Sequence, residues 1–412
     1  MSDAPSAAPW LSIVGVGEDG LGGVTPAARA LVDAAEVLVG GTRHLAMIPQ
    51  NHPAERLTWR SPLADTVAAL RRHEGRAVCV LATGDPMSYG IGVTLGREFG
   101  PAALSVHPVA GAFSLAAARL CWPLEEVGRL TLHGRPLALL AAHLAPRRRL
   151  LILSENGETP AAVARYLAAE GYGESRLVAL AHLGGAAEET HRAAAADWGE
   201  RRVADLNTLA VECAAGPGAP APGAAPGLPD DLFAHDGQLT KQEVRAATLA
   251  ALRPFPGAVL WDVGAGAGSI AIEWMRAGGR ALALEPKAAR RAFIAENAER
   301  LGTPQLAIVD GAAPDGLDAL LDRAPRPDAI FFGGGLTAGD GAERALAALA
   351  PGGRFVANAV TLEGEARLAT LHADRGGAMR RIAVSRLVAV GPYHGWRPMM
   401  PVTQYCWIKP HE

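Results

Sequence analysis

The sequence VLWDVGAGAGS, residues 259–269, decides the fold class of the second half of this chain. An apolar run that is typical of a buried strand passes into three alternating glycines and then into a helix-like segment, Ile270–Met275. Glycines at such a turn let the backbone approach a ligand at the start of a helix. Glu285 ends the next strand-like segment, 17 residues past Gly268, where a carboxylate can accept hydrogen bonds from both hydroxyls of a ribose. These features predict a Rossmann-like site that suits NAD or S-adenosylmethionine.

The spacing of the loop distinguishes between these two cofactors. Asp-x-Gly-x-Gly-x-Gly, which begins at Asp262, resembles the S-adenosylmethionine loop of Rossmann-like methyltransferases more than the GxGxxG loop of dehydrogenases. LAPGGRFV, residues 349–356, resembles the turn that leads into the fifth strand of the same enzymes. We therefore interpret the second half as a methyltransferase domain in which Asp262 orients the loop or the methionine end of the cofactor.

Four further motifs narrow the family of this half: DGQLTKQEVR at 236–245, VDGAAP at 309–314, FFGGG at 331–335 and VANAVTLE at 356–363. The first predicts a helix that begins with a capping box from Thr240 to Glu243, a role that a cofactor contact from Thr240 does not exclude. In order and spacing, the series resembles the precorrin C15 methyltransferase (decarboxylating) domain of corrin biosynthesis, from about Leu232 to Thr403. The resemblance implies S-adenosylmethionine contacts from the following residues: Thr240, Asp262, Gly264, Ala265, Gly266, Ala267, Gly268, Glu285 and Ala313.

The first half opens with a different glycine motif. GVGEDG, residues 15–20, satisfies GxGxxG, but we reject a dinucleotide site because the next strand-like segment ends at Gly40-Gly41 without a carboxylate. The longer string to Thr25-Pro26, together with TGDPMSYG at 83–90, resembles the tetrapyrrole methylases from about Trp10 to Val211. GTRHL at 41–45 and LHGRP at 132–136 resemble the subgroup that methylates C5 of the precorrin ring. The resemblance implies a cofactor contact at Gly84 and Asp85. The alternative for Asp85 is that its side chain only stabilises the turn.

A segment of small residues and five prolines, AAGPGAPAPGAAPGLP at 214–229, separates the two halves. Strand-like and helix-like segments alternate on both sides of it, which predicts α/β domains with largely parallel sheets. We expect a tetrapyrrole methylase domain of two α/β lobes over 1–213, a linker over 214–230 and a Rossmann-like domain over 231–412. The predicted strands are Leu11–Val16, Val37–Val39, Ala77–Leu81, Ser105–Pro108, Arg149–Leu153, Arg176–Ala181, Val259–Val263, Arg280–Leu284, Gln305–Val309, Asp328–Phe332 and Arg354–Ala357.

Composition excludes several classes of protein. No apolar stretch approaches the ~20 residues that a bilayer span needs, so no membrane association is expected. The N-terminal residues lack the pattern of a secretory signal, which favours a cytoplasmic location. The four cysteines are far apart with no CxxC pair, which predicts neither a metal site nor a disulfide framework. A net charge of −3 argues against nucleic acid as the main partner.

Together, the two resemblances imply the fused precorrin C5,15-methyltransferases (decarboxylating) of cobalamin biosynthesis. C5 methylation would belong to the first domain, and C15 methylation with decarboxylation of a ring acetate to the second. The implied substrate is a reduced tetrapyrrole with acetate and propionate arms, and the implied cofactor is S-adenosylmethionine. Carboxylates favour arginine and lysine partners, so the candidate substrate-binding residues are Arg43, Arg135, Lys241 and Arg245. For Lys241 and Arg245 the alternative is a solvated helix face. No catalytic residue or metal is assigned, and a homo-oligomer is expected.

Two other functions stay open at this point. Both fold types also serve enzymes that methylate ribosomal RNA, so an RNA-directed methyltransferase is one alternative. A non-catalytic scaffold that only senses S-adenosylmethionine is the other. A salt-sensitive shift with RNA would support the former, and product formation would eliminate the latter.

Overall fold

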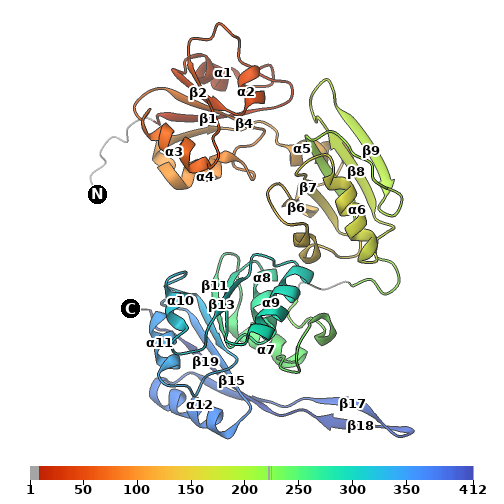
Figure 1. The fold of residues 1–412 in the computed structure, drawn as a ribbon, viewed down its shortest axis with the longest axis vertical. Coiled ribbons are helices and arrows are strands. Elements are labelled where there is room, and N and C mark those ends of the chain that lie inside the picture. The colour runs from red at the N-terminus through yellow and green to blue at the C-terminus, as the bar shows by residue number, and fades with distance from the viewer. Residues whose placement is uncertain (1–8, 221–222, 224, 412) are drawn as a thin grey trace. The chain divides into compact units, whose positions relative to one another are not determined.

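The computed structural model describes residues 9–220, 223 and 225–411 of the chain. These form two compact units (Figure 1), one comprising Met1–Arg135 with Ala145–Pro220 and the other Pro136–Leu144 with Ala221–Glu412. One boundary between the units, after Pro220, falls inside the segment 214–230 that the sequence analysis expects as a linker. The short helix η3 (Leu137–Ala142) groups with the second unit, which no sequence pattern indicated.

The first lobe of the first unit is a parallel sheet of five strands in the order β3-β2-β4-β1-β5. Its strands are β1 (Leu11–Val16), β2 (Val37–Gly40), β3 (Glu55–Thr58), β4 (Val78–Thr83) and β5 (Leu104–His107). The helices are α1 (Pro26–Asp33), α2 (Thr42–Ala46), α3 (Leu63–Arg71) and α4 (Ile91–Phe99). Successive side chains of β1 enter two different apolar clusters, one shared with α1 and the other with α3 and α4. The sheet is therefore covered on both faces, as the unbroken apolar run of β1 requires.

The second lobe has a mixed sheet in the order β6-β7-β10-β8-β9. Its elements are α5 (Ala112–Leu120), β6 (Val127–Thr131), β7 (Arg149–Leu153), α6 (Thr159–Ala169), β8 (Arg176–Ala181), β9 (Glu189–Ala194) and β10 (Asn207–Glu212). Only β6 and β7 pair in parallel, whereas β10 runs antiparallel between β7 and β8. The prediction of a largely parallel sheet is therefore wrong for this lobe, because β10 fills the position between the two predicted strands.

The second unit is a Rossmann-like layer structure. Its seven-stranded sheet has the order β13-β12-β11-β14-β15-β19-β16, in which the first five strands are parallel and β19 is antiparallel to both neighbours. The strands are β11 (Val259–Val263), β12 (Arg280–Glu285), β13 (Ala307–Asp310), β14 (Ala329–Phe332), β15 (Arg354–Ala359), β16 (Ala378–Ile382) and β19 (Val402–Ile408). The helices are α7 (Gln242–Leu252), α8 (Ser269–Arg276), α9 (Ala288–Arg300), α10 (Leu317–Leu321), α11 (Gly341–Ala348) and α12 (Leu362–Arg375).

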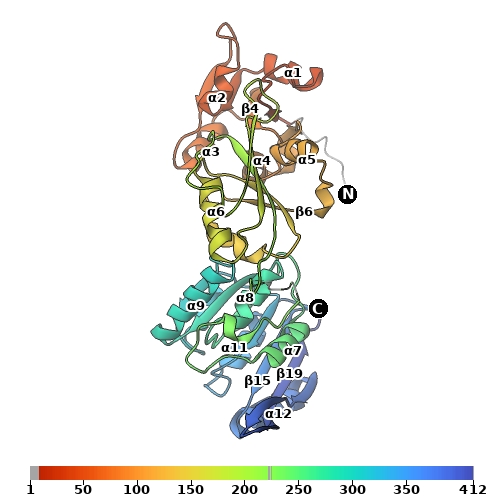
Figure 2. The same cartoon turned by 90° about the vertical axis from the view of Figure 1, so that its right-hand side faces the viewer.

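The helices of this unit cover the two faces of the sheet. α7, α8 and α9 bury one apolar cluster, and α10, α11 and α12 bury the other. α8 and α9 lie side by side in both views (Figures 1 and 2). A hairpin of β17 (Ser385–Val390) and β18 (Tyr393–Pro398) extends from the sheet as a separate two-stranded ribbon (Figure 1). None of the helices that the structure describes is long and apolar enough to cross a bilayer.

Both ends of the predicted linker segment are fastened to their own unit. In the first unit, the Gly216 amide donates to the Gly171 carbonyl at 2.8 Å, and the Tyr172 hydroxyl donates to the Pro220 carbonyl at 2.8 Å. In the second unit, the Gly227 and Leu228 amides donate to the carboxylate of Glu273 at 2.6 and 3.0 Å. Gly216, Pro220, Gly227 and Leu228 of the predicted linker are thus hydrogen-bonded to the unit on their own side.

Candidate active sites

The cavity of the second unit lies at the carboxyl ends of its parallel strands. Its volume is about 620 Å³, within the range of small-molecule sites. The loops after β11, β12, β13, β14 and β15 all contribute to its wall, as does the segment before α7. Seven predicted site residues meet there: Thr240, Lys241, Gly264, Ala265, Gly266, Glu285 and Ala313.

The glycine loop after β11 needs glycine for two separate reasons. Gly264 has a φ of +71°, and a Cβ there would lie 2.6 Å from the Gly334 amide nitrogen, so the loops after β11 and β14 touch at this point. Gly266 has a φ of +60° and faces the Gln238 carbonyl, 3.3 Å from where its Cβ would be. Because the backbone is bare at Gly266, a ligand can approach it directly.

Glu285 is the buried acid of this cavity. It ends β12, is 2% exposed and lines the wall beside the glycine loop. One carboxylate oxygen accepts from the Gly266 amide at 2.9 Å, and the other accepts from the Lys287 amide at 3.1 Å. Each oxygen can accept a further bond, so the carboxylate suits the two hydroxyls of a ribose.

Three predicted contacts lie beneath the loop instead of lining the cavity: Asp262, Ala267 and Gly268. Asp262 is 1% exposed, and its Oδ2 accepts from the Ala271 amide at 3.1 Å, which fixes the start of α8. Gly268 admits close packing of α9, since a Cβ there would lie 2.9 Å from the Ile294 side chain. In the structure these residues shape the loop and do not line the cavity.

Burial raises the pKa of Asp262 to about 7, and the nearby Glu285 carboxylate adds to the shift. Between about pH 4 and pH 7 the folded chain thus keeps a proton that the unfolded chain releases, so the unfolding free energy falls as the pH rises through this window. We expect Asp262→Asn to remove this dependence, so that its stability relative to the parent chain is higher at pH 8 than at pH 5. Urea unfolding at both pH values measures the difference. Asp315→Asn, at an exposed position of the same unit, is the control, and equal differences for both variants would contradict the prediction.

Arg245, a predicted substrate-binding residue, does not line the cavity of the second unit. Its side chain is fully buried and pairs with Glu273 and Asp230, and it also donates to the carbonyls of Thr240 and Leu228. For Arg245 the alternative of a solvated helix face is wrong, because the side chain is fully buried. A buried arginine needs such a complete set of partners because an unpaired buried charge is very costly. Arg245 therefore holds the segment that precedes α7 in place.

The predicted capping box is also wrong. The N-cap of α7 is Lys241, whose side chain makes no cap hydrogen bond. Glu243 instead pairs through both carboxylate oxygens with Arg386 of the hairpin, at 3.0 and 2.7 Å. Thr240 remains at the cavity wall, with its carbonyl held by Arg245.

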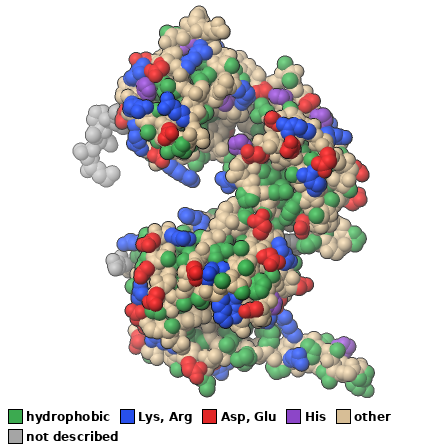
Figure 3. Space-filling model, in the orientation of Figure 1, with side chains coloured by type: hydrophobic (Ala, Val, Ile, Leu, Met, Phe, Trp, Pro, Cys, Tyr) green, Lys and Arg blue, Asp and Glu red, His purple; other side chains and the backbone are tan. Residues whose placement is uncertain are grey.

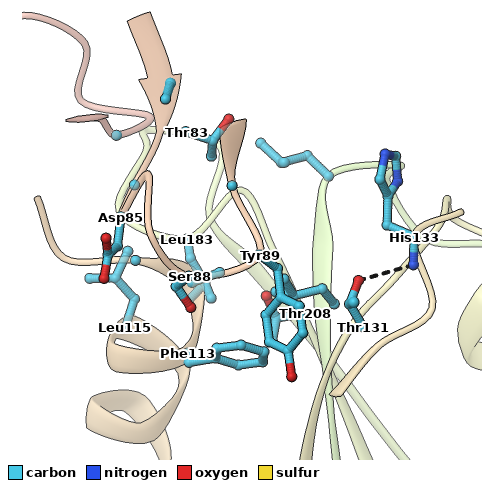
Figure 4. Close-up of a pocket in the computed structure, with 18 of the residues that line it drawn as sticks. Thr83, Asp85, Ser88, Tyr89, Phe113, Leu115, Thr131, His133, Leu183 and Thr208 are labelled. Atoms are coloured by element: carbon cyan, nitrogen blue, oxygen red, sulfur yellow. Dashed lines mark hydrogen bonds between the residues drawn. The ribbon is translucent and has the colours of Figure 1, made fainter. Parts of the chain in front are cut away.

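The cavity of the first unit lies between its two lobes and has a volume of about 460 Å³. The predicted residues Arg43, Gly84, Asp85 and Arg135 all line it. Figure 4 shows Thr83 at the end of β4 and Asp85 on the loop that follows, with Tyr89 beside Phe113. The two aromatic rings are 5.9 Å apart. The Arg135 guanidinium lies over the Tyr89 ring at 5.8 Å from its centroid. The aromatic wall thus meets cations and a carboxylate in one cavity.

The end of β1 and the loops after β4 and β5 converge so closely in this cavity that glycine is required. A Cβ on Gly15 would lie 1.9 Å from the Gly84 carbonyl oxygen, and a Cβ on Gly84, whose φ is +59°, would lie 2.8 Å from the Gly111 Cα. Asp85 accepts from the Met87 amide at 2.9 Å. It therefore braces its turn and also faces the cavity, so both interpretations of this residue hold geometrically.

Sequence reasoning missed a polar cluster around Arg43. The guanidinium pairs with Glu18 and donates to the Thr83 hydroxyl at 3.0 Å, and Glu18 also contacts His182 Nδ1 at 2.9 Å. His44 Nε2 lies 3.1 Å from the Thr83 hydroxyl, and burial, with the adjacent Arg43 charge, lowers the pKa of His44 to about 4. The motifs GVGEDG, GTRHL and TGDPMSYG contain Glu18, Arg43 with His44, and Thr83, but their pairing was not predicted because these segments and His182 are far apart in the chain. Their joint effect is to hold the Arg43 side chain at the cavity wall.

Two family models match the chain. Residues 11–197 match the Tetrapyrrole (Corrin/Porphyrin) Methylases, and residues 231–409 match the Precorrin methyltransferase domain. The precorrin-6Y C(5,15)-methyltransferase [decarboxylating] of Sinorhizobium sp is 44% identical over 410 residues, which cover 99% of this chain and 98% of the relative. The chain belongs to the precorrin-6Y C5,15-methyltransferase (decarboxylating) family. It is a methyltransferase.

Two shorter relatives are each named for only one of the two methylation reactions. A cobalt-precorrin-7 C(5)-methyltransferase of Salmonella typhimurium is 31% identical over 168 residues, 41% of this chain and 82% of the relative. A probable cobalt-precorrin-6B C(15)-methyltransferase (decarboxylating) of Pyrobaculum aerophilum is 34% identical over 195 residues, 44% of this chain and 95% of the relative. In other organisms, proteins named for the separate reactions are therefore about half as long as members of this family.

Proposed function

We propose that this chain methylates a precorrin at C5 and C15, with S-adenosylmethionine as donor, and releases carbon dioxide from a ring acetate, as a step of cobalamin biosynthesis. The observation that carries the proposal is the full-length relative of that name together with two separate glycine-walled cavities, one in each unit. The C5 reaction is assigned to the first unit and the C15 reaction with decarboxylation to the second. The two shorter relatives support this division, since each carries one activity in its name.

The residues of the second cavity fit S-adenosylmethionine. The bare backbone at Gly266 leaves room for a ligand beside the loop, and the buried Glu285 carboxylate can accept from the ribose hydroxyls. Thr240, Gly264, Ala265 and Ala313 complete the proposed donor site. Asp262, Ala267 and Gly268 do not line the cavity and hold the glycine loop through their contacts with α8 and α9. In the first cavity the proposed donor contacts are Gly84 and Asp85, where the end of β1 meets the loops after β4 and β5.

We assign binding of the substrate's carboxylate arms to cationic side chains at the cavity walls. Arg43 and Arg135 in the first unit, and Lys241 in the second, are the proposed partners. Glu18 and Thr83 hold the Arg43 guanidinium by two of its nitrogens, so its remaining N–H groups can donate to a substrate carboxylate without reorganising.

In the proposed reaction, the main task of the chain is to position the substrate relative to the methyl donor. Bound S-adenosylmethionine supplies a methyl group on a sulfonium, which a nucleophilic ring carbon can take up in line. The two cavities hold the ring by its arms, exclude water and fix the attacking carbon relative to the donor site, which can account for a large part of the rate enhancement. The conjugated ring of the substrate itself can accept the electron pair that decarboxylation releases. Among the residues that the structure describes, no three His, Cys, Asp or Glu side chains converge as a metal site would need.

Neither alternative function is favoured by a specific observation. The reported relatives are named for precorrins, and on the face drawn in Figure 3 the basic side chains alternate with acidic ones instead of forming one basic surface. A scaffold that only senses the donor would not need cations at both cavities.

Mass spectrometry of the products tests the proposal. With a reduced precorrin and S-adenosylmethionine under anaerobic conditions, the intact chain should add two methyl groups and remove one carbon dioxide. Replacing the donor with S-adenosylhomocysteine is the control and should leave the substrate mass unchanged. The absence of any methylated tetrapyrrole with the active donor would refute the function.

A further inference from the structure

One half of the second cavity is not explained by the donor site. Apart from Thr240, which precedes α7, the proposed donor contacts lie at or after the ends of β11, β12 and β13. Asn358 is the last residue but one of β15, on the other side of β11 with β14 between them. With strands about 4.8 Å apart, β15 lies roughly 14 Å from β12, the strand that carries Glu285. The β15 side of the cavity is therefore free for the molecule that receives the methyl group.

Asn358 is held there by two side chains that are fully buried. Its Nδ2 donates to the Thr248 hydroxyl at 3.0 Å, and its Oδ1 accepts from Gln404 Nε2 at 3.0 Å. Gln404 lies directly opposite Asn358 in the β15–β19 pairing and also donates to Thr248, at 3.1 Å. Thr248 donates its own proton to the Val244 carbonyl at 2.7 Å, so its oxygen can only accept from the two amides.

This network fixes which way the Asn358 amide points. With Nδ2 committed to Thr248 and Oδ1 to Gln404, one N–H and one lone pair of Asn358 remain, and the residue lines the cavity. Buried polar groups are costly unless they are fully paired. Asn358 is the member of this network that lines the cavity, and its free N–H and lone pair can therefore bind a ligand. Of the buried members, Gln404 Oε1 also has no partner.

The wall around Asn358 is apolar. Val360, Met399, Met400 and Val402 line the same cavity, and Val360 and Met400 are 46% and 66% exposed. The Met399 amide donates to the Val384 carbonyl at 2.9 Å, which fixes this segment at the base of the hairpin. Exposed methionines and valines provide an adaptable apolar surface that suits the flat face of a large ring.

We propose that the β15 side of this cavity binds the tetrapyrrole acceptor of the C15 reaction, with the ring against Val360, Met399 and Met400 and with Asn358 as the polar contact that orients it. Thr248 and Gln404 are positioning residues that act through Asn358. This inference rests on the proposed function. It adds the side of the cavity on which the acceptor lies and the residues that hold it.

Steady-state kinetics of C15 methylation on the full chain tests the acceptor subsite. Asn358→Ala should lower kcat/KM for the tetrapyrrole by about 10- to 100-fold, the effect of losing one oriented hydrogen bond, while calorimetry shows unchanged affinity for S-adenosylhomocysteine. Met400→Ala should raise KM for the tetrapyrrole without changing kcat, and Met379→Ala, a partly exposed methionine of β16 outside the cavity, is its matched control.

The positioning role needs a readout of its own. Thr248→Val should reproduce part of the Asn358→Ala loss in kcat/KM, and Thr248→Ser, which keeps the hydroxyl, should restore it. Thermal unfolding shows whether either variant is merely unstable. An Asn358→Ala chain with parental kcat/KM, or one that loses S-adenosylhomocysteine affinity to the same extent, would overturn the acceptor assignment. If the parent chain forms no C15-methylated product in the same assay, the proposed function fails instead.

Discussion

Gly266→Leu should abolish C15 methylation and the release of carbon dioxide, leaving a product with at most one added methyl group and its carboxyl group intact. Gly266 has a φ of +60°, and its missing Cβ faces the Gln238 carbonyl 3.3 Å away at the cavity wall. A leucine side chain there must enter the space that we assign to the donor. The backbone must also adopt a conformation that costs a non-glycine residue about 1 kcal/mol or more.

Calorimetry with S-adenosylhomocysteine separates the lost site from a lost fold. The full chain should bind two molecules, and Gly266→Leu should bind one. Gly257→Leu is the matched control, because Gly257 also has a positive φ, of +83°, but has no atom within 4 Å of its Cβ position and precedes β11 at the opposite end from the cavity. Two molecules bound by Gly266→Leu would place the donor elsewhere.

Local sequence patterns predicted several inner strands of the three larger sheets, because those patterns are set by burial on both faces. β1, β7, β8 and β11 have the predicted bounds, and the helix after the glycine loop begins at Ser269, one residue before its predicted start. α1 begins at Pro26 with Thr25 as N-cap, the position that favours proline. Each of these depends on residues adjacent in the chain.

Elements that depend on distant partners were missed. β10 takes its place because Thr208 pairs with Leu153 on one side and Leu180 on the other. β19 carries a polar residue, Gln404, that is fully buried only because Thr248 and Asn358 supply its hydrogen bonds. Neither arrangement can be inferred from periodicity, because the partners are set by the fold as a whole.

The candidate sites divide in the same way. The glycines and Glu285 could be placed at a cavity from spacing alone, since the ends of adjacent parallel strands meet at one edge of a sheet. Arg245 could not, because a charged residue on a helix is usually solvated, and its burial depends on Glu273 and Asp230 from other segments. The motif that contains Asn358 was identified by its resemblance to a family. The proposed role of Asn358, however, follows only from its hydrogen bonds to Thr248 and Gln404.

Gly84→Leu should have the opposite effect to Gly266→Leu and yield a singly methylated, decarboxylated product. Gly84 has a φ of +59°, and a Cβ there would lie 2.8 Å from the Gly111 Cα. A leucine must therefore push apart the loops after β4 and β5, which carry the proposed donor contacts of the first unit. Gly75→Leu is the control, with a φ of +87° at a turn before β4 and no atom within 4 Å.

The two variants together test whether each unit performs its own reaction. Each variant keeps the reaction that the other variant loses. An equal mixture of Gly84→Leu and Gly266→Leu chains should therefore restore the doubly methylated, decarboxylated product, provided that the intermediate dissociates from its first site. The mixture should not exceed the rate of the slower single step. Identical product masses from the separate variants would refute the division between the units while leaving the methyltransferase assignment intact, because both glycines would then serve one site. Different masses without restoration in the mixture would keep the division and show that the intermediate does not pass between chains.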